Sequence, residues 1–192
     1  MTDVVAQSGR NLVARTNLRR LLNGQETKEM WLDDEVINCY FGNLMARANA
    51  NRDLPKLYCF TSHFLESAFP DLCARKEKLF DMDVILIPVN VIKSHWVLVS
   101  VFPSKKAIIF YDSMYGCGFE VLMKILQIFG KRCQKETGHV PVGGEWSLTD
   151  EKSIPRQSNS FDCGVFVCQM AERLSRQSPF DFNQTQMPTI RL

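Results

Sequence analysis

The amino-acid sequence predicts an α+β domain in which helices flank a central mixed sheet. Two observations support this fold class. Short runs of β-branched and aromatic residues occupy the middle of the chain, and segments with helical spacing lie before, between and after them. The chain has 192 residues, a length that suits one globular domain, so we expect residues 1–192 to form a single domain.

The first predicted helix covers Trp31 to Ala48. Acidic side chains come early in this segment, and apolar residues then recur at alternating spacings of three and four, which is typical of an amphipathic helix. Asp33 or Asp34 marks its start. Two shorter helices are predicted, over Ser62 to Phe69, stopped by Pro70, and over Glu120 to Phe129, stopped by Gly130.

Three continuously apolar runs are predicted as strands that are buried on both faces. The short polar connector Pro103 to Lys106 can join the last two runs as a hairpin. The polar start of the chain and the stretches Lys131 to Gly138 and Gly143 to Arg156 are predicted as surface loops. The strand runs are Val84 to Val89, Trp96 to Phe102 and Ala107 to Tyr111.

The last predicted helix covers Cys163 to Arg176 and is expected to be half-buried. Polar residues line one side of it, and Val167, Met170, Ala171 and Leu174 line the other. Cys163 therefore lies in the first turn of a helix.

Composition excludes several function classes. Hydrophobic residues make up 45% of the chain and charged residues 23%, so neither a disordered nor a fibrous protein is indicated. The formal net charge is only +2, which gives little long-range field for binding nucleic acid or a membrane surface. The apolar runs are too short to cross a bilayer, and the N-terminus lacks a signal-peptide pattern, so we expect an intracellular, reducing compartment.

The seven cysteines are irregularly spaced, and none forms a Cys-x-x-Cys pair. The three histidines show no His-x-x-x-His spacing either. The sequence therefore predicts no metal site.

Strand register brings a histidine and a carboxylate together. In an antiparallel hairpin, facing residues have numbers with a constant sum, and a turn between Ser104 and Lys105 sets this sum to about 209. His95 and Asp112 should then lie at the same end of the sheet. A carboxylate in this position can hold the imidazole in one tautomer and stabilise its protonated form.

Cys163 is the candidate nucleophile for this pair. A helix N-terminus and a nearby imidazolium both stabilise a thiolate, which is the reactive form of cysteine. Gln157 lies six positions earlier, where its amide and the backbone amide of Cys163 can form an oxyanion hole. His63 and His139 compete with His95 as the base, but His63 lies in an apolar helical stretch and His139 has no obvious carboxylate partner.

Four segments resemble one known family in order along the chain. The segments WLDDEVIN (Trp31 to Asn38), His95-Trp96, YDSM (Tyr111 to Met114) and QSNSFDCG (Gln157 to Gly164) are similar to the SUMO/sentrin-specific proteases, which cleave ubiquitin-like modifiers. The similarity extends from about Leu18 to Met187. It implies a papain-like cysteine protease fold, a catalytic triad of His95, Asp112 and Cys163 with Gln157 as oxyanion donor, and no cofactor.

The resemblance also implies how substrate binds. Trp31 and Trp96 would form a flat tunnel that admits a Gly-Gly tail and excludes bulkier peptides. Asp33 and Asp34 would meet basic residues near the tail. The expected partner is SUMO with its conjugated proteins, and the enzyme is expected to be a monomer in the nucleus.

Alternatives remain at this point. Val84 to Trp96 and Phe182 to Pro188 look most like the SUMO-specific branch, whereas Ser158 to Asp162 leans towards the branch that acts on a Nedd-type modifier. A module that binds a modifier without cutting it is a second possibility. An acetyltransferase on a related scaffold is a third, against which the two tryptophans argue. The family usually continues after Met187-Pro188 into a terminal helix, which this chain is expected to lack.

Overall fold

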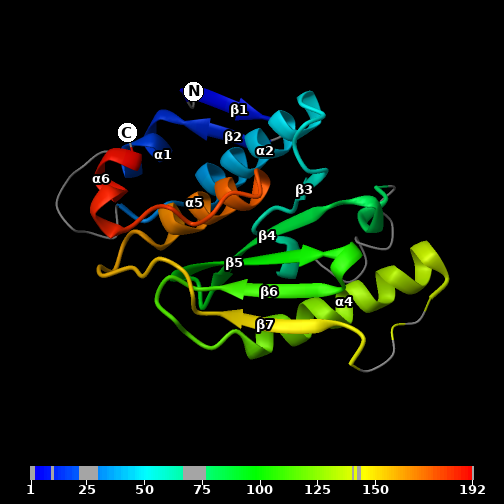
Figure 1. The fold of residues 1–192 in the computed structure, drawn as a ribbon. Coiled ribbons are helices and arrows are strands. Elements are labelled where there is room, and N and C mark those ends of the chain that lie inside the picture. The colour runs from blue at the N-terminus through cyan, green and yellow to red at the C-terminus, as the bar shows by residue number, and fades with distance from the viewer. Residues whose placement is uncertain are drawn as a thin grey trace.

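A five-stranded sheet forms the centre of the molecule (Figure 1). The computed structural model describes residues 3–9, 11–21, 30–66, 77–139, 141 and 144–191. The strand order is β3-β4-β5-β6-β7, with the middle three strands antiparallel and each outer strand parallel to its neighbour. The strands are β3 (Leu57–Cys59), β4 (Val84–Val91), β5 (His95–Phe102), β6 (Ala107–Tyr111) and β7 (Ser147–Glu151).

Helices cover both faces of the sheet. Helices α2 (Asp34–Ala50) and α5 (Cys163–Ser175) lie on one face, and α4 (Phe119–Thr137) lies on the other (Figure 1). Side chains alternate between the two layers along each strand, so Trp96 packs with α2 and α5 whereas Val97 packs with α4. This arrangement explains why the strand sequences are continuously apolar, and it confirms the predicted α+β class.

Two helices begin where the sequence predicts. Asp33 caps α2, because its carboxylate accepts a hydrogen bond from the backbone N–H of Val36 at 3.1 Å. Cys163 is the first residue of α5. The hairpin register is also as expected, with Leu98 facing Tyr111 and Phe102 facing Ala107.

Helix α4 is longer than the sequence predicts. It runs through Gly130 to Thr137, so the expected loop at Lys131 to Gly138 is wrong. Arg132 and Cys133 are buried and extend the packed face of the helix beyond the glycine. The helix ends instead at Gly138, whose φ of 73° is the left-handed conformation that glycine adopts readily.

Two other predicted loops contain strands. The stretch Gly143 to Arg156 includes β7, which pairs with β6 at the edge of the sheet and is too polar to be recognised from its composition. The polar start of the chain forms the hairpin of β1 (Val4–Ser8) and β2 (Asn11–Ala14), which lies beside α2 (Figure 1). In the predicted helix at 62–69, residues 64–66 are helical and 67–70 lie outside the described residues.

The two ends of the described chain meet near the start of α5. The short helices α1 (Arg15–Leu18) and α6 (Met187–Ile190) lie close to each other at this end of the molecule (Figure 1). The Arg191 guanidinium, just after α6, donates a hydrogen bond at 2.8 Å to the carbonyl of Arg20, in the 3₁₀ turn that follows α1 (Arg19–Leu21).

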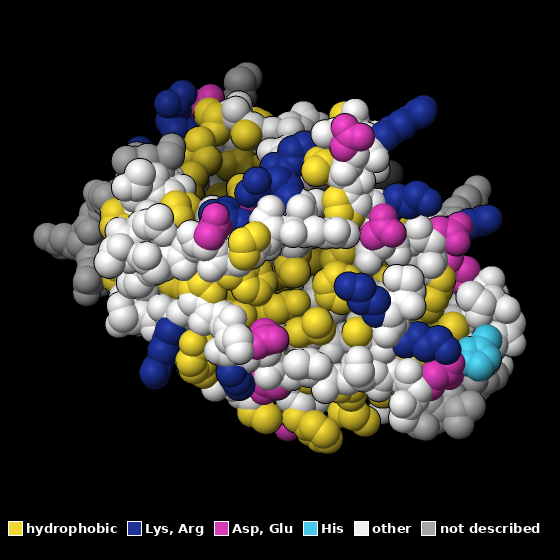
Figure 2. Space-filling model, in the orientation of Figure 1, with side chains coloured by type: hydrophobic (Ala, Val, Ile, Leu, Met, Phe, Trp, Pro, Cys, Tyr) yellow, Lys and Arg dark blue, Asp and Glu magenta, His cyan; other side chains and the backbone are white. Residues whose placement is uncertain are grey.

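The visible surface carries charges of both signs. Lys and Arg side chains are interspersed with acidic ones on the face shown in Figure 2, in keeping with the small net charge. Among the described helices, none has the length and apolar character needed to cross a membrane.

The course of α4 through Gly130 leads to a stability prediction. A Cβ at Gly130 would have no atom within 4 Å. Gly130→Ala should therefore raise the free energy of unfolding by about 0.5–1 kcal/mol in urea denaturation, because alanine loses less backbone entropy in a helix. Gly138→Ala is the matched control, since space is equally open there but φ is positive, and it should lower stability. A destabilising Gly130→Ala would argue against a helix at this position.

Candidate active site

The sheet register brings His95 and Asp112 into contact. His95 opens β5 and Asp112 follows β6, and the imidazole Nε2 lies 2.6 Å from the carboxylate Oδ1. The backbone N–H groups of Met114 and Gly116 also donate to the carboxylate, at 2.8 and 2.9 Å. Since Asp112 is buried, these three contacts hold its carboxylate in one orientation.

These contacts change the charge state of both groups. Burial alone would lower the pKa of His95, but hydrogen bonds and attraction from Asp112 and Cys163 raise this pKa from its ordinary 6.5 to about 9. Burial would raise the pKa of Asp112, but the His95 ring and the two N–H groups hold it below its usual range. At neutral pH the pair is therefore an imidazolium beside a carboxylate.

Cys163 completes the group. Its side chain is buried at the N-terminus of α5 and is the second hydrogen-bonding partner of His95. Nε2 is used by Asp112, which leaves Nδ1 for the sulfur. The structure thus brings together the three residues that the sequence predicted as a triad. A thiol beside an imidazolium at a helix N-terminus can act as a nucleophilic thiolate.

Gly164 has a packing role beside this nucleophile. A Cβ at this position would lie 2.9 Å from the Cβ of Leu32. Glycine therefore lets the first turn of α5 pack closely against the segment that carries Trp31.

Gln157 is held by Ser113, which directly follows Asp112. Ser113 Oγ donates to the Gln157 side-chain oxygen at 2.9 Å, and the Gln157 backbone N–H donates to the Ser113 carbonyl at 2.9 Å. The amide nitrogen donates one of its two protons to the carbonyl of Asn159 at 2.7 Å. The same nitrogen also donates to the Asn159 side-chain oxygen at 3.3 Å, so an oxyanion would take the place of this longer contact.

A buried ion pair fixes the loop that leads to the nucleophile. Asp162 precedes Cys163, and its Oδ1 accepts from the Arg191 Nε at 2.8 Å, while Asn159 and Gln184 donate to its other oxygen. The Arg191 side chain is only 1% exposed. It also donates to three backbone carbonyls, those of Arg20, Met30 and Phe161.

Sequence reasoning missed this supporting network. Asp162 and Ser113 lie within the segments that carry the family resemblance, but the sequence assigns neither of them a role. If an aspartate next to a buried cysteine is itself buried, its carboxylate needs a hydrogen-bond donor or a cation as partner. Nothing in the local pattern identifies Arg191, which lies 29 positions away.

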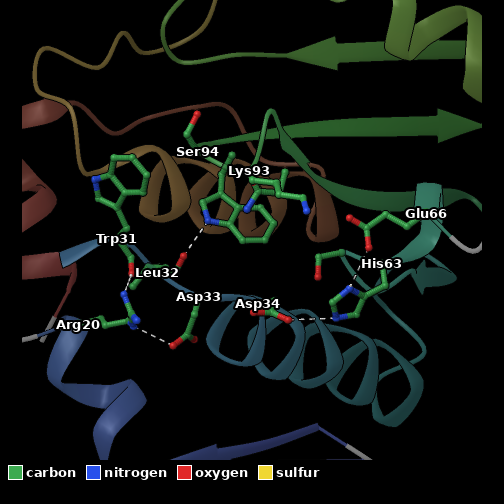
Figure 3. A pocket seen from close by; sticks show the side chains of 12 residues that line it. Arg20, Trp31, Leu32, Asp33, Asp34, His63, Glu66, Lys93 and Ser94 are labelled. Carbon is green, nitrogen blue, oxygen red and sulfur yellow. Dashed lines mark hydrogen bonds and ion pairs between the residues drawn. The ribbon is translucent and has the colours of Figure 1, made fainter. Parts of the chain in front are cut away.

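The four residues predicted to bind substrate line one pocket, shown in Figure 3. Its volume is about 320 Å³, and its walls include Trp31, Asp33, Asp34 and Trp96. The Trp96 indole is buried and its N–H donates to the carbonyl of Leu32 at 2.7 Å. The two tryptophans thus line the same pocket although they lie far apart in the sequence.

The two acidic residues predicted to bind substrate already have basic partners (Figure 3). Asp33 forms an ion pair with Arg20 at 2.8 Å in addition to capping α2. The Asp34 carboxylate lies 3.0 Å from the His63 imidazole. A basic ligand would therefore compete with Arg20 and His63, which, with Lys93, line the pocket and were not selected from the sequence.

The other two histidines differ from their predicted settings. The His63 side chain is 56% exposed, so it is not a core residue. His139 does have a carboxylate partner, Glu145, at 2.9 Å. However, His139 follows the far end of α4, whose 19 residues span about 28 Å. His95 remains the histidine that contacts Cys163.

Metal ligands do not gather in the described part of the chain, where no three His, Cys, Asp or Glu side chains are placed to hold an ion. The six cysteines within the described ranges are free thiols, and Cys73 lies outside them.

Proteins of known family resemble this chain in sequence. Residues 30–192 match the family described as the Ulp1 protease family, C-terminal catalytic domain. The sentrin-specific protease of Caenorhabditis elegans is 33% identical over 168 residues, covering 84% of this chain and 24% of that protein. Sentrin-specific protease 2 of Homo sapiens is 36% identical over 169 residues, covering 84% of this chain and 28% of that protein. The chain thus spans about a quarter of the length of these relatives.

Solved structures share the fold. The C-terminal Ulp1 protease domain, solved in complex with Smt3, the yeast orthologue of SUMO, matches with a TM-score of 0.74 at 23% identity, covering 94% of this chain and 80% of that one. The catalytic domain of the Chaetomium thermophilum Ulp1-like SUMO protease matches with a TM-score of 0.70 at 26% identity, covering 97% and 81%. These matches confirm the predicted fold.

The raised pKa of His95 can be measured directly. We expect the imidazole resonance of His95 to titrate near pH 9 in NMR, and at lower pH in Asp112→Asn, because the neutral amide no longer stabilises the imidazolium. Because the pKa of His95 is raised by folding, the protonated imidazole stabilises the folded protein. This stabilisation is present in full below about pH 6.5 and is lost as pH rises through about 9. An unchanged titration in Asp112→Asn would contradict the assigned cause.

The buried ion pair of Arg191 with Asp162 should make a large contribution to the free energy of unfolding. Arg191→Met leaves the Asp162 carboxylate buried without its cation, which should cost about 3–5 kcal/mol of unfolding free energy in urea denaturation. Arg15→Met is the control, because Arg15 pairs with Asp3 at the same 2.8 Å but on the surface, where such a pair contributes about 0–1 kcal/mol. Equal losses in the two variants would contradict the role of burial.

Proposed function

Because the chain belongs to the Ulp1 protease family, we propose that it is a cysteine protease that cleaves after the C-terminal Gly-Gly of SUMO. The contact of His95 with both Asp112 and Cys163 is the observation that carries the proposal. The names of the relatives and of the matched yeast complex support SUMO as the substrate. We infer that the described residues form one catalytic domain.

The proposed reaction proceeds in two steps. The Cys163 thiolate attacks the carbonyl carbon of the last glycine, and the negative charge that develops on oxygen is stabilised by the Gln157 amide and the Cys163 backbone N–H. The C–N bond then breaks, and the His95 imidazolium gives its proton to the leaving amine. Water hydrolyses the resulting thioester with His95 as base.

Trp31 and Trp96 are proposed to select the Gly-Gly tail. They line the same pocket, next to the segment that packs against the first turn of α5. A slot between aromatic rings admits residues without side chains, so larger residues at these two positions would be excluded. Asp33 and Asp34 are proposed to meet basic residues near the tail by exchanging their present partners, Arg20 and His63.

Two alternatives remain testable. A Nedd-type modifier is favoured only by the sequence Ser158 to Asp162. A module that binds a modifier without cutting it is disfavoured by the intact geometry around Cys163, because binding alone needs no paired imidazolium and carboxylate. We also propose a nuclear location, which imaging of the tagged chain would test.

The decisive experiment uses SUMO that carries a fluorogenic amide at its C-terminus. The wild-type chain should release the fluorophore and Cys163→Ser should not, because the hydroxyl is too weak a nucleophile. Gln157→Ala should lower kcat by about 10²–10³-fold, the usual cost of losing one oxyanion donor. Cys117→Ser is the matched control, since Cys117 is an exposed thiol outside the triad, and it should keep full activity.

The same assay separates the alternatives. Release from a Nedd-type modifier but not from SUMO would replace the substrate. Tight binding of SUMO by the wild-type chain without release of the fluorophore would favour the binding module and would contradict the proposal.

A further inference from the structure

A second groove borders the catalytic pair, and the proposed function does not use it. Its volume is about 630 Å³, in the range of ligand pockets, and His95 and Asp112 form part of its wall. Its floor includes Val97 and Phe110, which belong to the core layer under α4. Exposed apolar side chains form its rim, namely Ile92, Met114 and Phe119.

This groove and the Trp31 pocket lie on opposite faces of the sheet. Trp96, in the wall of the Trp31 pocket, packs in the core layer of α2 and α5, whereas Val97 packs in the layer of α4. His95 stands at the end of β5 between the two. The groove therefore adjoins the catalytic pair on the face of the sheet away from the Trp31 pocket.

Ile92 is held in an unfavourable conformation at the groove. It lies in the turn between β4 and β5, where the Ser94 N–H donates to the Val91 carbonyl at 3.2 Å. Its φ is 50°, a value that a β-branched residue rarely adopts, and turns of this kind favour asparagine or glycine. The side chain is nevertheless 89% exposed. Folding alone does not explain an isoleucine here, and strained positions of this kind gather at functional sites.

The chemistry of the proposed reaction identifies the side of the substrate that reaches this groove. His95 must protonate the leaving amine when the C–N bond breaks, so the leaving group lies against the imidazole. In an isopeptide substrate this amine is the side chain of a lysine on the released protein. Residues beside that lysine therefore meet the surface that adjoins His95.

We propose that the groove lined by Ile92, Met114 and Phe119, here called the leaving-group groove, binds apolar side chains beside the acceptor lysine of the released protein. This inference rests on the proposed function. The groove would discriminate between conjugates that carry the same modifier, because the modifier occupies the opposite side of the scissile bond. Buried apolar area between rim and substrate would supply the preference.

Three substrates that all carry SUMO and differ only in the leaving group test the proposal. One is SUMO with the fluorogenic amide, and two are SUMO joined through an isopeptide bond to a lysine peptide, with either leucine or serine on both sides of the lysine. Wild type should cleave the leucine peptide about five- to tenfold faster in kcat/KM than the serine peptide. The fluorogenic substrate reports the basal reaction, since it lacks a peptide in the groove.

Variants at the rim should remove this preference without reducing basal activity. Ile92→Asn and Phe119→Ser should bring the leucine-to-serine ratio towards one, with an unchanged rate on the fluorogenic substrate. Ile92→Asn should also raise Tm by about 2–4 °C, because asparagine tolerates a positive φ. Leu12→Ser, at an exposed apolar residue of β2, is the control and should keep the ratio.

Each outcome bears on a distinct claim. Equal rates on the two peptides in wild type, or a ratio that persists in both rim variants, would overturn the groove assignment while the proposed protease activity stands. A wild-type chain that does not cleave the fluorogenic substrate would overturn the proposed function and the groove assignment with it.

Discussion

The backbone register between β5 and β6 is the constraint on which the site depends. Because Leu98 faces Tyr111, His95 and Asp112 lie at the same end of the sheet, where the imidazole is 2.6 Å from the carboxylate. A slip of one residue would send every side chain of one strand to the other face and separate the pair. The apolar layers under α4 and under α5 prevent such a slip, because each side chain of the shifted strand would leave the layer in which it packs and enter the opposite one. The catalytic geometry is therefore a by-product of core packing.

Sequence reasoning succeeded where a short-range rule applies. A constant sum across a hairpin, an aspartate at a helix start and a cysteine at the first turn of an apolar helix each need only a few neighbouring residues, and all three are as predicted. It failed at Gly130 and in β7, where distant residues decide. A glycine does not stop a helix whose buried face continues, and a polar segment becomes a strand when a neighbour offers hydrogen bonds. The contacts of Gln157 and Asp162 also depend on residues that local patterns cannot connect.

Apolar packing and polar contacts have different roles at the centre of the molecule. The apolar layers fix the positions of the strands and helices, whereas polar contacts fix the orientation of individual side chains. Asp112 uses three donors to orient one carboxylate, and Ser113 orients the adjacent amide of Gln157. Consecutive residues at the exit of β6 thus support the base and the oxyanion donor. Both supports come from one rigid strand end, so their relative placement is preserved when loops move.

The contacts of the Arg191 side chain also bear on the order of events during synthesis of the chain. It joins the residue before the nucleophile to carbonyls near positions 20 and 30, so both early and late parts of the chain must be in place around Cys163. During synthesis, the thiol and its histidine emerge from the ribosome before residue 191 does. A nascent chain thus holds the reactive groups without the contacts that order them. The loop before Cys163 therefore gains the Arg191 contacts only after the catalytic side chains have been made.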